Sequence, residues 1–201
     1  MTLSLLSLFL TACSLPPSKV AKVDARVSAH QESGLTCFPR EIDRCAESSP
    51  VLELGRADIR DGSHHVSLIE TGEDALKLRI HLLRSAQRYI DVQNFILRKD
   101  ETGELFLNEM LAASKRGVKV RLLLDQMFTF SVLLYLVMMS MEQIYFDISF
   151  YNPTFYNANM SNSDLLKVTA CCFRRFKQWL HNKLLVVDDT VGLTGGRNIA
   201  D

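Results

Sequence analysis

Three polar side chains near the end of the chain have the chemistry needed to attack and hold a phosphate ester. His181 and Lys183 stand two residues apart, and Asn198 follows Gly195 and Gly196, where the absence of a Cβ lets backbone approach a ligand oxygen. A neutral imidazole can attack phosphorus, while an ammonium group and an amide N–H stabilise charge on the non-bridging oxygens. These residues therefore predict an anion pocket that requires neither a metal nor a cofactor.

The surrounding residues predict a β-hairpin that holds this group. Residues 184–187 are apolar and partly β-branched, an Asp-Asp-Thr turn follows, and a second short strand ends at Thr194. This order is typical of strand, turn and strand. Because side chains alternate along a strand, we expect His181 and Lys183 to project from one face, and Asp188 to face the other way and brace the structure.

The spacing of these residues resembles a known signature. His181-x-Lys183-x4-Asp188-x6-Gly195-Gly196-x-Asn198 is similar to the HKD motif of the phospholipase D superfamily. The flanking segments resemble the bacterial cardiolipin synthase branch, and the similarity runs from about Glu73 to the last residue. It is clearest at residues 89–95, 112–125 and 195–199.

The resemblance implies a role for each residue. His181 would be the nucleophile that forms a phosphohistidine with a phosphatidyl group, while Lys183 and Asn198 would hold phosphate oxygens. Asp188, counted with the catalytic residues, would support the fold. A second histidine, from a second motif, would serve as acid to the leaving alcohol and base to the acceptor alcohol.

Members of this branch carry two such motifs in the halves of a pseudo-dimer, whereas this chain carries one. Three hypotheses follow. The favoured one is the amino-terminal half of a cardiolipin synthase-like phosphatidyltransferase or phospholipase D, which needs a second HKD half in trans or as a homodimer. The second is a single-motif nuclease or phosphodiesterase that homodimerises. The third is an inactive, membrane-tethered remnant or binding module.

Composition predicts one folded domain and does not favour nucleic acid as the partner. The chain has 201 residues, of which 47% are hydrophobic, so it can bury one sizeable core. Its 23 basic and 23 acidic residues give a formal net charge of +0, and no global basic field attracts nucleic acid. Any preference for an anion must therefore be local, and the phospholipid substrate is what the resemblance implies.

Alternating helical and strand-like segments predict an α/β fold, with a mixed or mostly parallel sheet flanked by helices and incomplete at the C-terminus. Strands are expected at residues 89–97, 118–125 and 143–151, helices at 103–115 and from Thr71 onward, a short strand around 64–69, and a loop at 157–164. The apolar residues 131–141 should form a buried or interfacial helix, too short to span a bilayer.

Polar residues at strand ends are further candidates for the site. Ligands gather at the carboxyl ends of strands in such sheets, which makes Asp125 and Gln126 candidate rim residues. Gln93 and Asn94, on a strand that the family shares, could also reach the site. Residues 173–180 interleave basic and aromatic side chains directly before the motif, a pattern that a solvated amphipathic stretch would also show. Its place beside the expected phosphate pocket favours steering of anionic head groups, and the same pattern would suit a nucleic-acid backbone.

The amino-terminal residues predict export and anchoring. Residues 1–13 resemble a lipoprotein signal peptide that ends at a lipidated Cys13, and the alternative is a chance apolar start. Residues 14–51 form a linker and lead-in, and residues 52–201 the phospholipase D-like half-domain. This places the protein in the bacterial cell envelope, membrane-anchored on the periplasmic side.

The remaining cysteines leave the redox state open. Cys37 and Cys45 could form a disulfide in an exported protein or remain free thiols. Cys171 and Cys172 are adjacent, and we expect them to pack rather than to pair with each other. No cysteine or histidine spacing is typical of a zinc site.

Overall fold

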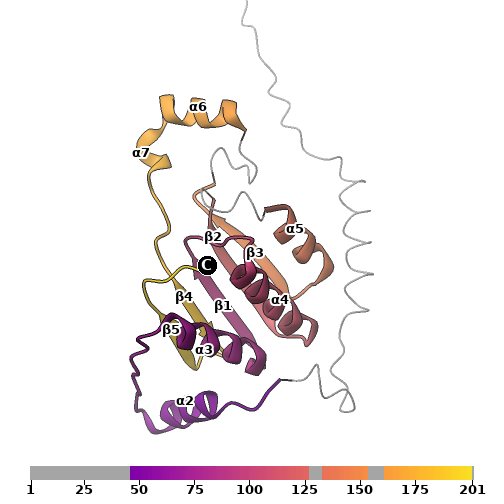
Figure 1. Ribbon diagram of the computed structural model, residues 1–201, viewed down its shortest axis with the longest axis vertical. Helices are drawn as coiled ribbons and strands as arrows, with labels where there is room; N and C mark the ends of the chain where they lie inside the picture. The colour runs from indigo at the N-terminus through magenta and orange to yellow at the C-terminus, as the bar shows by residue number, and fades with distance from the viewer. Residues whose placement is uncertain (1–45, 127–132, 154–160, 201) are drawn as a thin grey trace, which may run out of the picture.

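The computed structural model describes residues 46–126, 133–153 and 161–200, which fold around a five-stranded sheet (Figure 1). The strand order is β3-β2-β1-β4-β5. The strands are β1 (Tyr89–Asn94), β2 (Lys119–Asp125), β3 (Phe146–Tyr151), β4 (Leu184–Val187) and β5 (Val191–Thr194). β2 lies parallel to β1 and β3, whereas β4 lies antiparallel to β1 and β5. The predicted α/β fold with a mixed sheet is confirmed, as is the hairpin of β4 and β5.

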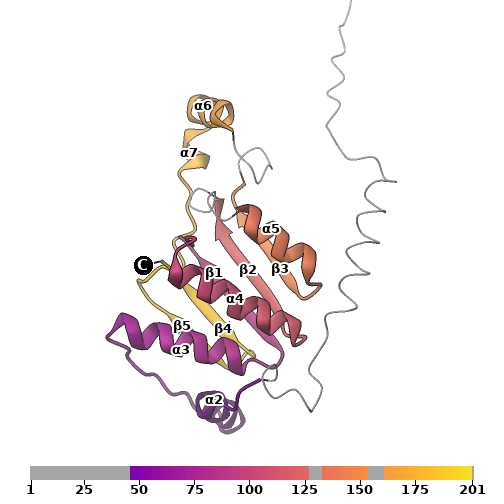
Figure 2. The ribbon, with the colours of Figure 1, turned by 45° about the vertical axis from the view of Figure 1, so that its right-hand side comes forward.

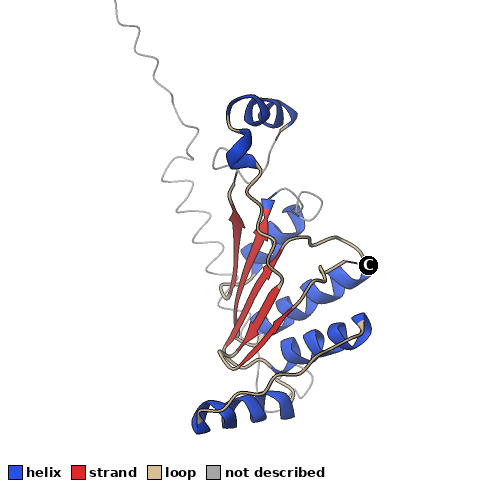
Figure 3. Cartoon of the chain, turned by 90° about the vertical axis from the view of Figure 1, so that its left-hand side faces the viewer, coloured by secondary structure: helices blue, strands red, loops and turns tan. Residues whose placement is uncertain are grey.

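Three helices cover one face of this sheet: α3 (Gly72–Ser85), α4 (Glu101–Lys115) and α5 (Leu133–Glu142). α4 connects β1 to β2 and α5 connects β2 to β3, and two right-handed crossovers place both helices on the same side. Figure 2 shows α3, α4 and α5 in front of the strands, and Figure 3 shows the strands close to edge-on. Alternate strand residues such as Ile90 and Val120 join Leu82 and Phe106 of the helices in one core.

Local sequence fixes where the covering helices begin. The Thr71 hydroxyl accepts a hydrogen bond from the Asp74 N–H at 3.1 Å and caps α3. Asp100 caps α4 in the same way, through the Gly103 N–H at 2.9 Å. Gly103 is required there, because a Cβ would stand 1.9 Å from the carbonyl oxygen of Arg98. The segment that follows β1 is therefore held closely against the first turn of α4.

The opposite face of the sheet carries no helix within the described ranges. Its side chains are mixed: Arg121 of β2 forms an ion pair with Asp91 of β1, and half-buried apolar residues of β4 lie beside them. In the part of the chain that is described, no helix is long and apolar enough to cross a membrane.

Several expected elements were wrong or missed. Residues 64–69 form no strand, and Val66 and Leu68 are exposed. The sequence interpretation missed α2 (Pro50–Asp61), which begins before the expected boundary of the half-domain at residue 52 and packs near β5. Part of the expected loop begins a helix instead, α6 (Asn162–Cys171). The rest of that loop, residues 157–160, lies outside the described residues.

Helices α6 and α7 (Phe173–Phe176) lie beyond the carboxyl ends of the parallel strands (Figure 1). Cys171 and Cys172 form a disulfide between these two helices, so the expectation that they would not pair was wrong. Cys13, Cys37 and Cys45 lie outside the described residues, as does the whole of the segment 1–45.

Candidate functional site

The ring of Phe95, directly after β1, contacts two of the candidate catalytic side chains. The imidazole of His181 meets this ring edge-on, with 4.8 Å between the ring centroids. The Nζ atom of Lys183 lies 5.3 Å from the centroid of the same ring. Lys183 also donates a hydrogen bond from Nζ to the backbone oxygen of His181, at 3.2 Å. The two side chains therefore lie at one place, at the start of β4.

These two side chains differ in exposure. His181 is exposed, whereas Lys183 is only 8% exposed. Among the described residues no carboxylate pairs with Lys183, whose ammonium group is held by a carbonyl oxygen and an aromatic face. Burial of a cation without an opposite charge is unfavourable, so this arrangement favours a bound anion.

The backbone around His181 is fixed by residues at the ends of β1 and β2. The carboxylate of Asp125, which is buried, accepts a hydrogen bond from the Leu180 N–H at 2.8 Å. The Asn182 amide donates to the side-chain oxygen of Gln93 at 3.0 Å. Asp125, one of the two candidate rim residues, and Gln93 thus hold the neighbours of His181 on either side.

The other two candidates at strand ends, Asn94 and Gln126, are buried. Asn94 donates from its side chain to the carbonyl oxygen of Ile96 in the turn after β1, and Gln126 is 4% exposed. The contact of Asn94 shapes the turn that carries Phe95.

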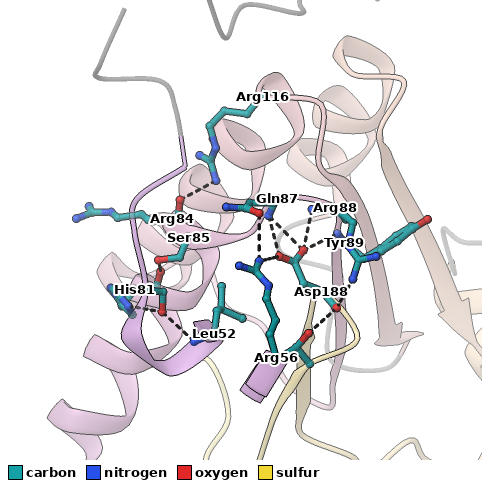
Figure 4. Close-up of polar contacts among 12 residues, drawn as sticks. Leu52, Arg56, His81, Arg84, Ser85, Gln87, Arg88, Tyr89, Arg116 and Asp188 are labelled. Atoms are coloured by element: carbon teal, nitrogen blue, oxygen red, sulfur yellow. Dashed lines mark hydrogen bonds and ion pairs between the residues drawn. The ribbon is translucent and has the colours of Figure 1, made fainter. Parts of the chain in front are cut away.

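Asp188 lies at the opposite end of β4 from Lys183 and has no exposed surface (Figure 4). Its carboxylate accepts hydrogen bonds from the backbone N–H groups of Gln87, Arg88 and Tyr89, at 2.7 to 3.1 Å. The guanidinium of Arg56, from α2, lies 3.2 Å from the same carboxylate. Asp188 therefore joins α2, the start of β1 and the hairpin, and contacts neither His181 nor Lys183.

Asn198 lies in a neighbouring cavity of about 640 Å³ rather than on the Phe95 ring. Its side-chain oxygen is buried and has no hydrogen-bond partner in the structure. The cavity is also lined by Arg79, Arg98 and Arg197. Arg79 and Ile199 reach the wall of a small cavity beside Lys183 as well, so the two places adjoin.

Gly195 and Gly196 are exposed, and a Cβ at either position would meet no atom within 4 Å. No protein atom therefore requires glycine at these positions. A role for their backbone in holding a ligand stays a prediction.

The basic and aromatic stretch reaches the site through Trp179. This side chain is exposed, and its ring lies 6.3 Å from that of Phe95, centroid to centroid. Lys177, in contrast, lies over the Phe173 ring at 4.6 Å, on α7. Trp179 and His181 thus share Phe95 as a neighbour.

Sequence reasoning gave no role to Phe95 or Arg79. A signal existed for Arg79, because it stands three residues after Leu76 and four before Leu83, on the apolar stripe of α3. For Phe95 the sequence shows only an aromatic residue at the end of a strand, which does not by itself indicate a site. Within the described ranges, no group of three or more His, Cys, Asp or Glu side chains could hold a metal ion.

Comparison with known proteins gives the chain's relatives. A family model described as "Cardiolipin synthase, PLD-like domain" matches residues 79–201. An uncharacterized protein of Helicobacter pylori is 31% identical over 157 residues, which is 77% of this chain and 30% of that protein. Cardiolipin synthase C of Escherichia coli is 35% identical over 135 residues, 66% of this chain and 27% of the enzyme.

A more distant cardiolipin synthase also matches over part of its length. Cardiolipin synthase 2 of Staphylococcus epidermidis is 22% identical over 89% of this chain and 34% of the enzyme. The chain thus spans about a third of the length of these relatives. Among solved structures, the archaeal chromatin protein TrmBL2 aligns with a TM-score of 0.39 and 12% identity over 87% of this chain and 57% of that chain, a similarity too low to indicate a shared fold.

Proposed function

Because this chain belongs to the phospholipase D-like cardiolipin synthase family, we propose that it forms one half of a phosphatidyltransferase or phospholipid phosphodiesterase site, with His181 as the nucleophile. The observation that carries the proposal is the placement of an exposed imidazole beside the buried, carboxylate-free ammonium group of Lys183. Together they offer an attacking group and a counter-charge for one phosphate.

In the first step, an imidazole nitrogen of His181 attacks the phosphorus of a phospholipid. A bond forms between nitrogen and phosphorus, the bond from phosphorus to the head-group oxygen breaks, and that oxygen takes up a proton as the alcohol leaves. Lys183 stabilises the charge that develops on the non-bridging oxygens, and Asn198 assists from the adjoining cavity wall.

In the second step, an acceptor alcohol or water gives up a proton and attacks the phosphohistidine. The bond between phosphorus and nitrogen breaks and restores the imidazole. Both proton transfers need a second titratable group, which we assign to the histidine of a second HKD half, supplied in trans or by another copy of this chain. The partner half therefore completes the site.

Anchoring is the second element of the proposal. Lipidation of Cys13 would hold the domain on the periplasmic side of the cell envelope, next to its phospholipid substrate. Growth of a bacterial strain expressing the full chain with a radioactive fatty acid tests this: the label should enter the wild type and be absent from Cys13→Ser. Equal labelling of the two would contradict the proposal.

A labelling experiment tests the chemistry. The full chain is incubated with vesicles of phosphatidylglycerol that carries radioactive phosphate, and acid-labile label on the protein is measured. We expect label on the wild type and on His64→Ala, a matched control at an exposed histidine outside the site, and none on His181→Ala. Undiminished label on His181→Ala would rule out the proposed nucleophile. Nicking of plasmid DNA by the same preparation, without lipid labelling, would instead support a nuclease.

A further inference from the structure

Residues 64–70, which connect α2 to α3 along the outer edge of the molecule, are called the exposed segment below (Figure 1). They form no helix, strand or turn, and no residue among them has a positive φ. Within the described ranges, none of their backbone groups hydrogen-bonds to another backbone group. Val66 and Leu68 are 98% and 85% exposed, the highest values of the large apolar side chains that the structure describes. Unpaired backbone and apolar, partly β-branched side chains make this segment available to another strand.

Contacts on one side hold the exposed segment against the molecule. The Nδ1 atom of His65 lies 2.6 Å from the buried carboxylate of Asp58, in α2, and Ile69 is half-buried. Side chains alternate along an extended chain, so His65 and Ile69 facing the molecule leave Val66 and Leu68 facing outward. The segment is therefore held in place while its apolar side faces solvent.

The sequence of the exposed segment is complementary to itself in an antiparallel arrangement. A pair centred on Ser67 places Val66 of one copy opposite Leu68 of the other, and His64 opposite Glu70. Apolar side chains directly opposite each other stabilise such a pair, and an imidazole N–H can donate to a carboxylate. Two-fold symmetry forms each of these contacts twice.

Charge also separates a second copy from other partners. The exposed segment contains no Lys or Arg, so it offers no complementary charge to an anionic lipid surface or to nucleic acid. A second copy, in contrast, supplies both an apolar face and an opposite partner for each polar end of the segment.

We propose that the exposed segment is a dimerisation surface, which pairs antiparallel with the exposed segment of a second copy of this chain. The two-fold axis passes beside Ser67, and backbone N–H and C=O groups that are unpaired in the single chain pair across it. One strand pair buries less than a standard interface of about 800 Å² per partner, so the association is weak and depends on concentration.

This contact is separate from the candidate site. Within the described ranges, no hydrogen bond, ion pair or ring contact joins the exposed segment to His181 or Lys183. The inference therefore goes beyond the proposed function and does not depend on it.

A cysteine at the two-fold axis tests the register. In Ser67→Cys the two new thiols would lie opposite each other, with Cα atoms about 4.5–5.5 Å apart, within the range of a disulfide. Oxidation of the full chain by molecular oxygen should give a dimer on a non-reducing gel, and both linked peptides should contain residue 67. This dimer should be absent from the wild type.

Ser63→Cys is the matched control at an exposed serine. Its two copies would lie about 26 Å apart along the same pair, too far for a disulfide, and it should give no dimer beyond that of the wild type. No dimer from Ser67→Cys, or equal amounts from the two variants, would overturn the proposal.

Sedimentation velocity across a concentration series measures the contact without a new cysteine. Leu68→Ser should weaken self-association by at least about tenfold, because each copy loses an apolar side chain that the pair buries. Leu166→Ser, at an exposed leucine of α6, is the matched control and should change it less than about twofold. Both variants should unfold at the wild-type temperature in dilute solution, since both leucines are exposed in the single chain. Self-association that Leu68→Ser leaves intact would overturn the proposal.

Flotation with phosphatidylglycerol vesicles distinguishes a lipid contact from a protein contact. The unlipidated full chain should float to the same extent with and without Leu68→Ser. Loss of flotation in Leu68→Ser, without loss of self-association, would assign Val66 and Leu68 to a bilayer and overturn the proposal.

Discussion

The imidazole of His181 and the ring of Phe95 meet at an angle of 68° between their planes. This contact, and the hydrogen bond of Asp125 to the backbone of Leu180, hold the candidate nucleophile from both the side chain and the main chain. Fixed orientation matters because attack at phosphorus requires alignment, and a small misplacement of a reacting group can cost about 100-fold in rate.

Phe95→Leu should lower the rate at which label passes from the lipid to the protein by about tenfold. Leucine keeps apolar volume but offers no ring to His181 and Lys183. The expected loss of stability is about 1 kcal/mol. Label transfer and thermal unfolding measure the two effects. The matched control is Phe146→Leu, at a buried ring on β3, which should lose similar stability and retain the labelling rate. Equal rates in both variants would remove Phe95 from the site.

Asp125→Ala should reduce turnover by about tenfold or more with little change in substrate affinity, because it releases the Leu180 N–H next to the nucleophile. Loss of the buried acceptor should also destabilise the fold by about 1–3 kcal/mol. Asp125→Asn keeps an acceptor oxygen and should restore most of the rate. A rate that follows stability alone across the two variants would refute a positioning role.

Asp188→Asn should destabilise the protein by about 2–4 kcal/mol, because three backbone donors and Arg56 lose a charged acceptor. Urea unfolding measures this. Asp189→Asn provides a matched control in the same turn. Asp189 is exposed and has a positive φ of 56°, which asparagine tolerates, so its change should stay within about 0.5 kcal/mol. Comparable losses at the two positions would contradict the bracing role of Asp188.

Turnover by the isolated chain should rise with the square of its concentration in dilute solution, because one copy supplies the nucleophile and a second supplies the acid. The initial rate at which glycerol is released from phosphatidylglycerol, measured across a dilution series, tests this, with sedimentation to follow self-association. A linear dependence with a monomeric chain would contradict completion of the site by a second copy.

The parallel strands and the hairpin could be predicted because their sequences carry local signals. Residues 122–124 and 184–187 are short apolar runs, and the turn at Asp188 and Asp189 separates the second run from β5. The family could also be predicted, because the motif has fixed spacing. Residues 64–69 show how such patterns fail: apolar and polar residues alternate there, but no neighbouring strand pairs with them.

Two missed helix starts had recognisable caps. Ser49 accepts from the Leu52 N–H and precedes Pro50, and Ser161 and Asp164 form a capping box. Both signals are present in the sequence.

The cavity that contains Asn198 had no comparable signal. Arg79, Arg98 and Arg197 come from three segments that only the tertiary fold brings together. The same holds for Phe95, whose two partners follow it by more than eighty residues. Local pattern thus predicted most of the elements and the candidate nucleophile, while the surroundings of His181 depended on long-range packing.

The two ends of β4 carry residues with different roles. Its leading end carries the histidine and lysine, and its trailing end carries the aspartate that ties α2 and β1 together, four strand residues away. A descendant of this protein without catalytic activity could therefore lose the first pair and keep every hydrogen bond that ties α2 to β1, yet would still need Asp188 for those bonds. Asp188 alone is thus a poor marker of catalytic activity in a related sequence. His181 and Lys183, ahead of the strand, are the better markers.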